Sequence, residues 1–477
     1  MYRERVSLRV HGRGCGTLGL PMPVTPQQAP SAVPSLVTRF GLDKGIAACW
    51  WRTLFPSLGL FLLTAAFIVT KTGRDALFFQ ERGLLHLPRA YLGIAFLSAP
   101  AAGLMLQLIR RAGPRRARVV GLCLMAALQC AFFWFAEPGG GWWMTLLFVL
   151  VPLLYGVLLS ITWLLGADLL DRVPPYLLAR LYASIGAASM LGGLSGAALS
   201  RRWSAILTPQ EFFLAGSALL LATAGVNVIA ARLFGADARS ANPGVLPTPT
   251  EVPETRAVFS LLRVRYLAIL AGTGVVTAIV GVLIEFQFYS AASAAAHSSR
   301  EGLRLFANFY MLLNGAAVLV QLFATPFLQR VFGVYGSLLI LPTALFGAAG
   351  VVAWSATVAT RTALRVTEGG IKSSIHRSNW EQSYLPVVRE HRAAAKLLVD
   401  GMAARMGEGA AAVMLLVAVT TVSNGPESLN LGWTNAVILT GVVVWLCLTV
   451  ALGRSRNGPE LNPEPGEFRP DLPIPDG

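Results

Sequence analysis

The sequence predicts an all-α integral membrane protein with twelve transmembrane helices in two pseudo-symmetric six-helix halves. Of the 477 residues, 55% are hydrophobic and only 13% are charged. The hydrophobic residues come in runs of about 20, which is the length that crosses a bilayer. Segments such as "TLLFVLVPLLYGVLLSITWLLGA" are apolar on every side, whereas the helices of a large soluble protein need a polar face. The fold class is therefore a polytopic bundle.

Twelve runs are long and apolar enough to be membrane spans. They cover residues 53–72, 90–110, 119–136, 142–167, 178–200, 211–234, 265–289, 303–329, 333–353, 355–377, 395–421 and 430–453.

Segments rich in proline and charge divide the chain into five parts. Residues 1–50 form a basic cytoplasmic arm, 51–234 the first six-helix half, 235–258 a cytoplasmic linker, 259–454 the second half and 455–477 a disordered cytoplasmic tail. The linker contains "GADARSANPGVLPTPTEVPETRAV", which is too polar and too rich in proline to pack as a span.

The formal charge of +15 would suit nucleic acid, but the arginines gather in the N-terminal arm, the loop "RRAGPRRAR" and the linker. Basic residues in short loops mark the cytoplasmic side of a membrane. We therefore expect a multi-pass protein of the cell (inner) membrane with both termini in the cytoplasm, and with lipid rather than nucleic acid around it. The first apolar run begins near Leu54, so no cleavable signal peptide is expected.

An internal repeat supports the two halves. "ARLYASIGAASMLGG" (179–193) and "AKLLVDGMAARMGEG" (395–409) align without gaps, in the fifth and eleventh spans. A parallel duplication of six helices is typical of the major-facilitator type of bundle, which holds substrate between its halves. Chance similarity between two helices rich in small residues is the alternative. In the fifth span, Gly192 and Gly196 are interpreted as a helix-packing motif.

The tenth span carries a stripe of charge in "RTALRVTEGGIKSSIHR" (361–377). At about 100° per residue, the side chains of Arg361, Arg365, Glu368, Lys372 and His376 fall within a sector of about 80°. Each charge costs about 2.5–3.5 kcal/mol against lipid, so the stripe predicts a polar cavity. The alternative is an amphipathic helix that lies outside the bilayer.

Two further spans place charge near this cavity. Lys71, Arg74 and Asp75 end the first span, and i, i+4 spacing lets Asp75 pair with Lys71 and leaves Arg74 available for a ligand. Glu285 is the lone carboxylate of the seventh span, so it either pairs with a cavity cation or binds a proton. The alternatives are an exposed outer loop for the first group and an interfacial position for Glu285.

The eleventh span adds Lys396 and Asp400, with Arg405 and Glu408 on another face. Cations outnumber carboxylates among these candidates, and arginine forks onto phosphate or carboxylate oxygens. The cavity is therefore expected to bind an anion. Five scattered cysteines support neither a disulfide framework nor a metal site, and no nucleophile and base are paired, so neither a cofactor nor an enzyme is expected.

Several stretches resemble the ATP/ADP translocase family of nucleotide transporters, which is related to the major facilitators. The similar segments are "KTGRDALFF", "TWLLGAD" followed by "ARLYASIGAASMLGGLSG", "LIEFQF", "GGIKSSIHRSNWEQSYLP" and "AAKLLVDGMAARMGEG". Their order and spacing hold over about residues 54–420. The resemblance implies phosphate binding or coupling by Lys71, Arg74, Glu285, Lys372 and Lys396. Glu408 stands where the family has a lysine.

Taken together, these features predict a secondary active transporter that moves a nucleotide or other phosphate-bearing organic anion by alternating access, as a monomer. We expect Arg74, Lys372 and Lys396 to neutralise the substrate, and Glu285 and Asp400 to pair with them after its release. The expected substrate-binding residues are Lys71, Arg74, Arg361, Arg365, Lys372 and Lys396; the coupling residues are Asp75, Glu285, Glu368 and Asp400; secondary candidates are Tyr182, Arg180, His376, Arg405 and Glu408. Two alternatives stay open: a proton-coupled carrier of an unrelated solute, and a receptor or scaffold that transports nothing.

Overall fold

A computed structural model describes residues 44–135, 141–170, 175–239, 261–387, 392–421 and 432–455. The chain divides into two compact units, Met1–Ala47 and Ala48–Gly477, and nearly all described residues belong to the second. Within the described ranges every regular element is a helix. Most of the arm, most of the linker, and the tail beyond Ser455 lie outside these residues; residues 44–50 of the predicted arm are helical.

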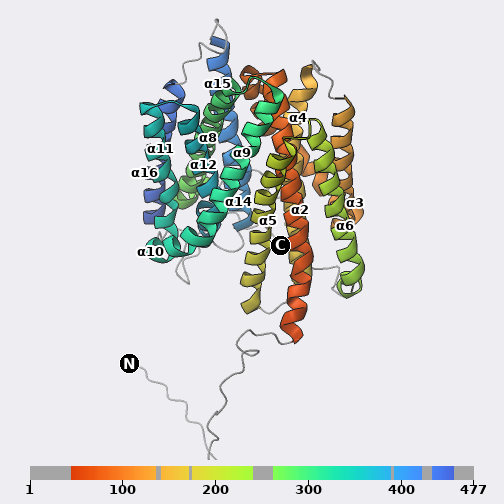
Figure 1. Ribbon diagram of the computed structural model, residues 1–477. Coiled ribbons are helices and arrows are strands. Elements are labelled where there is room, and N and C mark those ends of the chain that lie inside the picture. Colours follow the sequence, from red (N-terminus) through yellow and green to blue (C-terminus); the bar gives the residue numbers. More distant parts are fainter. Residues whose placement is uncertain are drawn as a thin grey trace, which may run out of the picture. The chain divides into compact units, whose positions relative to one another are not determined.

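Figure 1 shows the helices, coloured in their order along the chain. Their bounds are α2 Lys44–Glu81, η1 Leu84–His86, α3 Leu87–Phe135, α4 Gly141–Leu170, α5 Pro175–Trp203, α6 Glu211–Arg239, η2 Leu261–Arg263, α8 Arg265–Ala295, α9 Ser299–Leu319, η3 Val320–Ala324, α10 Thr325–Leu338, α11 Ile340–Trp354, α12 Val358–Ile371, η4 Lys372–His376, α13 Arg377–Gln382, α14 Arg392–Lys396, η6 Leu397–Ala403, α15 Ala404–Thr421 and α16 Gly432–Ser455.

The described residues contain nine helices that are long and apolar enough to cross a membrane. Three expected spans do not meet that standard: 178–200 in α5, 333–353 in the shorter apolar helix α11, and 355–377 in α12, whose charges lower its hydropathy. Large apolar side chains also face outward, as in Phe96, Phe323 and Trp354, which are 77%, 73% and 93% exposed. Such faces suit lipid rather than water, and the chain is a multi-pass membrane protein.

Two expected span boundaries coincide with glycines. Gly113 (φ 78°) separates the two helices joined in α3, and Gly333 (φ 65°) interrupts α10. Positive φ costs other residues a steric clash that glycine avoids. The chain is therefore kinked at Gly113 and Gly333, although α3 and α10 each extend across the kink. A different boundary has moved: α6 runs on to Arg239, past the end expected at residue 234.

In the first part of the chain α3 packs on α4 and α6, and in the second part α8 packs on α15 and α16. Figure 1 shows α2–α6 in red to yellow-green and α8–α16 in green to blue. They meet where α5 packs on α9 and where α15 packs on α3. The largest core cluster contains residues of both sets, including Phe148, Tyr289 and Phe306. The six-plus-six division by duplication stays a prediction.

Small residues let two pairs of helices cross closely. A Cβ on Gly196 of α5 would lie 2.6 Å from the carbonyl oxygen of Ala65 in α2, and one on Gly407 of α15 would lie 2.9 Å from the Cβ of Ala278 in α8. No larger side chain fits at such distances. The Gly192–Gly196 motif thus serves helix packing. In the predicted duplication, the pair α5 and α2 would correspond to the pair α15 and α8.

Candidate functional site

Four charged side chains of α8, α12 and η4 form an alternating row, which we call the charge ladder: Glu285, Arg365, Glu368 and Lys372. Arg365 donates to Glu285 Oε1 at 3.0 Å and also pairs with Glu368 Oε2. Lys372 Nζ completes the row at 2.9 Å from Glu368 Oε1. The side chain of Glu368 is 3% exposed, whereas those of Glu285 and Lys372 are 21% and 42% exposed. The ladder is thus anchored in the bundle and open at both ends.

Glycines bring the helices that carry the ladder together. A Cβ on Gly281 of α8 would stand 3.1 Å from Lys372 Nζ and 3.4 Å from Glu368 Oε1. One on Gly370 of α12 would stand 3.4 Å from the Cβ of Ala316 in α9. These positions give the charged side chains room between α8 and α12. At its start, α12 is fixed by a capping box in which Thr357 and Thr360 bond to each other's backbone amides.

The expected stripe on the tenth span holds for three of its five residues. Arg365, Glu368 and Lys372 form the ladder, but His376 stacks on Trp380 with ring centroids 5.7 Å apart and meets Trp445 edge to face at 5.5 Å. The π-helix η4 spans Lys372–His376. A π-helix has a wider turn and therefore advances fewer degrees per residue than an α-helix. This places His376 off the stripe and against the rings of Trp380 and Trp445.

The remaining stripe residue, Arg361, stays apart from the ladder. It lies one turn before Arg365 and makes no ion pair with a residue in the described ranges, and its Nε is buried without a hydrogen-bond partner.

A second cluster, the Asp75 cluster, joins α2 to α8 and α9 through Arg74, Asp75, Tyr289 and Tyr310. Arg74 Nε donates to Asp75 Oδ1 at 2.8 Å. The Tyr289 hydroxyl donates to Asp75 Oδ2 at 2.9 Å, and the Tyr310 hydroxyl donates to the same oxygen. Asp75 is 0% and Arg74 is 2% exposed. A buried carboxylate is stable only with such donors.

The expected pairing of Asp75 with Lys71 is therefore wrong, and so is the expectation that Arg74 is available. The carboxylate of Asp75 is oriented toward α8 and α9 by its hydrogen bonds from Tyr289 and Tyr310, and the guanidinium of Arg74 pairs with it there. Arg74 also donates to the carbonyl oxygen of Phe148 at 3.3 Å and lies 4.0 Å from the centroid of that ring.

Lys71 is left as the unpaired cation of the first span. Its Nζ lies 4.9 Å from the Tyr310 ring centroid and 5.9 Å from that of Phe67. It makes no ion pair or hydrogen bond with any residue that the structure describes.

The charges of the eleventh span lie away from the ladder. Asp400 in η6 accepts hydrogen bonds of 2.8 Å from Trp380 Nε1 and from the Tyr384 hydroxyl. Burial, together with the charge of Asp400, raises the pKa of Tyr384 and keeps it a proton donor. Lys396 instead pairs with Glu381, and both side chains are nearly half exposed.

We expected Asp400 to pair with one of the substrate-binding cations, such as Lys396, when no substrate is bound. This expectation is wrong for this state, because Asp400 is bonded to Trp380 and Tyr384 and Lys396 is paired with Glu381. The other charges of this span pair with each other: Arg405 Nη1 lies 2.5 Å from Glu408 Oε2. Of the secondary candidates in α5, Tyr182 packs against a small cluster around Leu60. The side chain of Arg180 lies outside the described residues.

The sequence did not single out Tyr91, Thr277, Gly281, Tyr289 or Tyr310. Tyrosines and a threonine within apolar runs give no signal, because they are common there. Only Gly281 could have been found, since it lies one turn before Glu285 on the same helix face.

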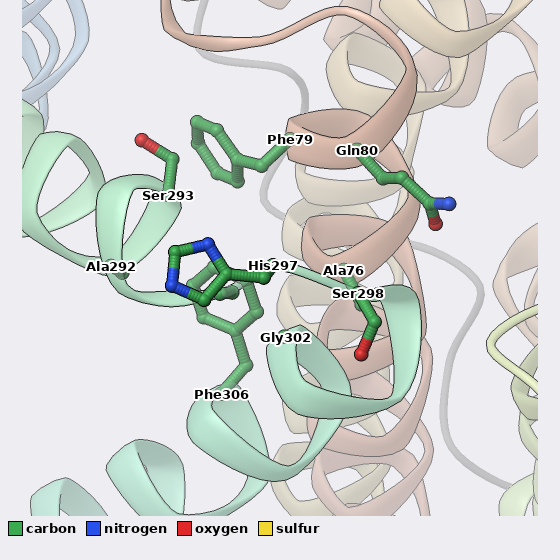
Figure 2. A pocket seen from close by; sticks show the side chains of 10 residues that line it. Ala76, Phe79, Gln80, Ala292, Ser293, His297, Ser298, Gly302 and Phe306 are labelled. Carbon is green, nitrogen blue, oxygen red and sulfur yellow. The ribbon is translucent and has the colours of Figure 1, made fainter.

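A pocket of about 190 Å³ lies where α2 and α8 end and α9 begins (Figure 2). We call this part of the bundle the Glu81 end. Figure 2 shows the rings of Phe79, His297 and Phe306 around it. No ladder residue lines it. Because Ala76 is one of its lining residues, the Asp75 cluster lies directly beneath.

Solved structures with the same arrangement of helices place this chain in the major-facilitator fold class. It is similar to the nucleoside transporter NupG, with a TM-score of 0.59 and 12% sequence identity over 85% of this chain and 99% of that chain. A D-xylose–proton symporter follows with a TM-score of 0.57 and 13% identity over 83% and 96% of the two chains. An auto-inhibited POT family peptide transporter has a TM-score of 0.53 and 12% identity over 84% and 96%.

No protein-family model matches the sequence, and no curated protein is significantly similar to it. At identities this low the structural likeness defines the fold. The ATP/ADP translocase resemblance stays a prediction.

Proposed function

We propose that the protein is a secondary transporter that moves a small organic anion across the membrane by alternating access. The observation that carries this proposal is the charge ladder, because four ionised groups are held within a bundle of membrane helices and remain accessible at both ends. Charge inside a membrane protein is costly and is found where it faces water or a substrate. The structural neighbours are transporters of nucleosides, sugars and peptides, which supports a small-molecule substrate.

Within this proposal, a phosphate-bearing substrate such as a nucleotide is the first candidate, on the strength of the sequence resemblance. The ladder cations Arg365 and Lys372 would bind the oxygens of this substrate. Glu285 would then lose Arg365 as its partner and would pair with another cation, such as Lys71. Arg365 and Lys372 belong to the ladder, which is 42% exposed at Lys372, and Lys71 makes no ion pair with a described residue. Arg74 is instead buried in the Asp75 cluster, and Lys396 pairs with Glu381. Arg365, Lys372 and Lys71 are therefore the substrate-binding residues that we retain.

The Asp75 cluster supports a state closed at the Glu81 end. It ties α2 to α8 and α9 through hydrogen bonds between sequence-distant residues, and Ser299 adds one to Gln80. In an alternating-access cycle these bonds have to break before the protein can open at the Glu81 end. We propose that the Glu81 end faces outward, because the sequence predicts that both termini lie in the cytoplasm. We also propose, as the sequence predicts, that the protein lies in the inner membrane as a monomer.

The test is uptake by the purified protein in liposomes, with radiolabelled ADP and ATP and with a labelled dicarboxylate, at equal and at opposed pH. We expect uptake of an anion that unlabelled anion inhibits, and loss of it in Lys372→Gln. The matched control is Arg304→Gln, because Arg304 is an exposed cation of α9 outside the site. If no anion is taken up, or if Lys372→Gln transports as the control does, the proposal is wrong.

A second candidate is a proton-coupled carrier of an uncharged solute. Glu285 favours it, because this carboxylate is 21% exposed and lies in a membrane helix, and one neighbour is a sugar–proton symporter. Uptake of labelled nucleoside or xylose that strictly needs a pH gradient and is lost in Glu285→Gln would favour this candidate over the first.

A further inference from the structure

The pocket at the Glu81 end lies between the two sets of helices, α2–α6 and α8–α16. Ala76, Phe79 and Gln80 line it from α2, and the other seven lining residues come from the end of α8, the turn after it and the start of α9. Figure 2 shows the side chains of Phe79 and Gln80 together with those of His297 and Phe306. A molecule in this pocket would therefore contact both sets of helices at once.

Two phenyl rings form the apolar wall of the pocket. The ring centroids of Phe79 and Phe306 lie 5.8 Å apart, with 32° between the ring planes. Both side chains belong to the largest core cluster and are buried, so the wall is fixed in place. Aromatic rings pack well against the face or the edge of another planar ring. This wall favours a ligand that contains an aromatic ring.

Two of the four polar side chains that line the pocket already have partners. The Ser293 hydroxyl donates to the carbonyl oxygen of Ser290 at 3.1 Å. Ser298 Oγ accepts a hydrogen bond of 3.3 Å from the backbone amide of Glu301 and caps α9. These two hydroxyls therefore serve the ends of α8 and α9.

The other two polar side chains, Gln80 and His297, keep groups for a ligand. Ser299 donates to Gln80 Oε1, which leaves the NH₂ of Gln80 and the imidazole of His297 without a hydrogen bond to the described residues. Both side chains are exposed, so a ligand can reach them from the Glu81 end. A neutral imidazole donates from one nitrogen and accepts at the other. One or two polar groups on a ligand would thus be satisfied.

The size and the charge of the pocket limit the ligand further. A cavity of about 150 Å³ holds one benzene molecule, so about 190 Å³ holds about eight non-hydrogen atoms. No Asp, Glu, Lys or Arg is among the described lining residues, and a buried charge without a partner is strongly unfavourable. A pyranose is too large, and most of its hydroxyls would lack partners here. An uncharged aromatic ring with one carbonyl or amide group meets these limits.

We propose that the pocket at the Glu81 end binds an uncharged, monocyclic heteroaromatic compound, and that this ligand holds the Glu81 end closed. The inference rests on the proposed transport function and adds a means of inhibiting it. Opening this end moves α2 away from α8 and α9, and so moves Phe79 and Gln80 away from His297 and Phe306. The pocket is complete only in the closed state. A ligand that binds one state shifts the population toward that state, and transport needs both.

The first test is ligand-observed NMR with the full chain in detergent, with empty micelles as the background. The probes are nicotinamide and uracil, which should bind with dissociation constants of about 0.1–1 mM, as expected for about eight non-hydrogen atoms. Cyclohexanecarboxamide should bind about three- to tenfold more weakly than nicotinamide, because it lacks the aromatic contact. Nicotinate and glucose should bind about tenfold more weakly or not at all.

Pocket variants locate the binding. Ala296→Phe should fill the pocket and abolish nicotinamide binding. The matched control is Ala294→Phe, which places the same ring on an exposed residue of α8 that does not line the pocket. Ser293→Leu fills the pocket from another position and replaces Ala296→Phe if that variant does not fold. His297→Leu should weaken nicotinamide binding about three- to tenfold, the effect of one lost neutral hydrogen bond.

Two further measurements test whether the ligand closes the Glu81 end. Nicotinamide should lower the maximal rate of anion uptake into liposomes without changing the KM for the anion, and Ala296→Phe should be insensitive to it. Nicotinamide should also slow amide hydrogen exchange in residues 76–82 and 292–306, which reports closure without any need for transport.

The outcomes separate this inference from the proposed function. No binding of either probe, or binding that Ala296→Phe and Ser293→Leu leave unchanged, overturns the site. Binding in the pocket without slower hydrogen exchange, or inhibition that is purely competitive with the anion, overturns the closing role. If the protein takes up no anion, the proposed function is wrong, and the binding and exchange measurements still decide this inference.

Discussion

Replacing Asp75 by asparagine should destabilise the protein more than any other single polar substitution in α2. The change leaves the guanidinium of Arg74 buried beside an uncharged amide. Arg74 is 2% exposed, so water cannot solvate it, and it keeps only the Phe148 carbonyl and ring. Breaking a buried ion pair by removing one partner costs about 3–5 kcal/mol. The free energy of unfolding should fall by about that amount.

Two further variants test whether the buried ion pair is the cause of this loss of stability. Tyr289→Phe removes one donor to Asp75 Oδ2 and leaves the ion pair, so it should cost about 1.5–3 kcal/mol. Replacing both Arg74 and Asp75 by leucine and methionine removes the charges together and should cost less than Asp75→Asn alone. The assay is reversible unfolding of the detergent-solubilised protein by SDS. If Asp75→Asn unfolds within about 1 kcal/mol of the wild type, the pair is not desolvated and the account of the cluster fails.

Three further substitutions have different expected results. Gly196→Leu should prevent folding, because its side chain would overlap the backbone of Ala65, 2.6 Å from the Cβ position, and monodisperse yield on size exclusion measures this. Lys396→Gln should change stability by less than about 1 kcal/mol in the same SDS assay, since its pair with Glu381 is nearly half exposed. Gly281→Val should displace the ammonium that ends the ladder and reduce liposome uptake severalfold without preventing folding; full uptake would contradict the ladder's role.

The spans could be predicted from sequence because a bilayer sets their length and their apolarity. Their ends could not be predicted closely: α2 begins at Lys44 and ends at Glu81, whereas the run of apolar residues suggested 53–72. Helices continue past the hydrocarbon as long as their backbone hydrogen bonds are kept and no glycine or proline stops them. The breaks at Gly113 and Gly333 are visible in the sequence only as glycines among many.

The ladder could be predicted in part, because helical spacing places Arg365, Glu368 and Lys372 on one face. The position of His376 could not, since the π-helix that turns it toward Trp380 and Trp445 has no sequence signal that we can identify.

The partners of the other charged residues could not be predicted from the sequence for a different reason. Asp75 is bonded by Tyr289 and Tyr310, which are more than 200 residues away in sequence. Local spacing favoured Lys71, and a local pair forms only when no distant donor competes with it. In a buried site, two hydroxyls and a guanidinium satisfy a carboxylate more completely than one ammonium does.

Lys71 and Glu285 each lie one helical turn before one of two residues that touch. Lys71 precedes Asp75 by four residues in α2, Glu285 precedes Tyr289 by four residues in α8, and the Tyr289 hydroxyl donates to Asp75 Oδ2 at 2.9 Å. Residues four apart lie on the same face of a helix, so Lys71 and Glu285 come to the same region of the bundle. Two groups of like charge would repel each other strongly in such a low-dielectric interior.

This relation predicts that Glu285→Lys is far more damaging than Glu285→Gln. The lysine would add repulsion with Lys71 and Arg365 to the loss of an ion pair, whereas the glutamine only loses the pair. Unfolding in SDS of the two variants, with and without Lys71→Gln in the same chain, measures the difference. Removing Lys71 should rescue part of the stability of Glu285→Lys and none of that of Glu285→Gln. Equal effects of Lys71→Gln in both backgrounds would mean that residues 71 and 285 do not interact.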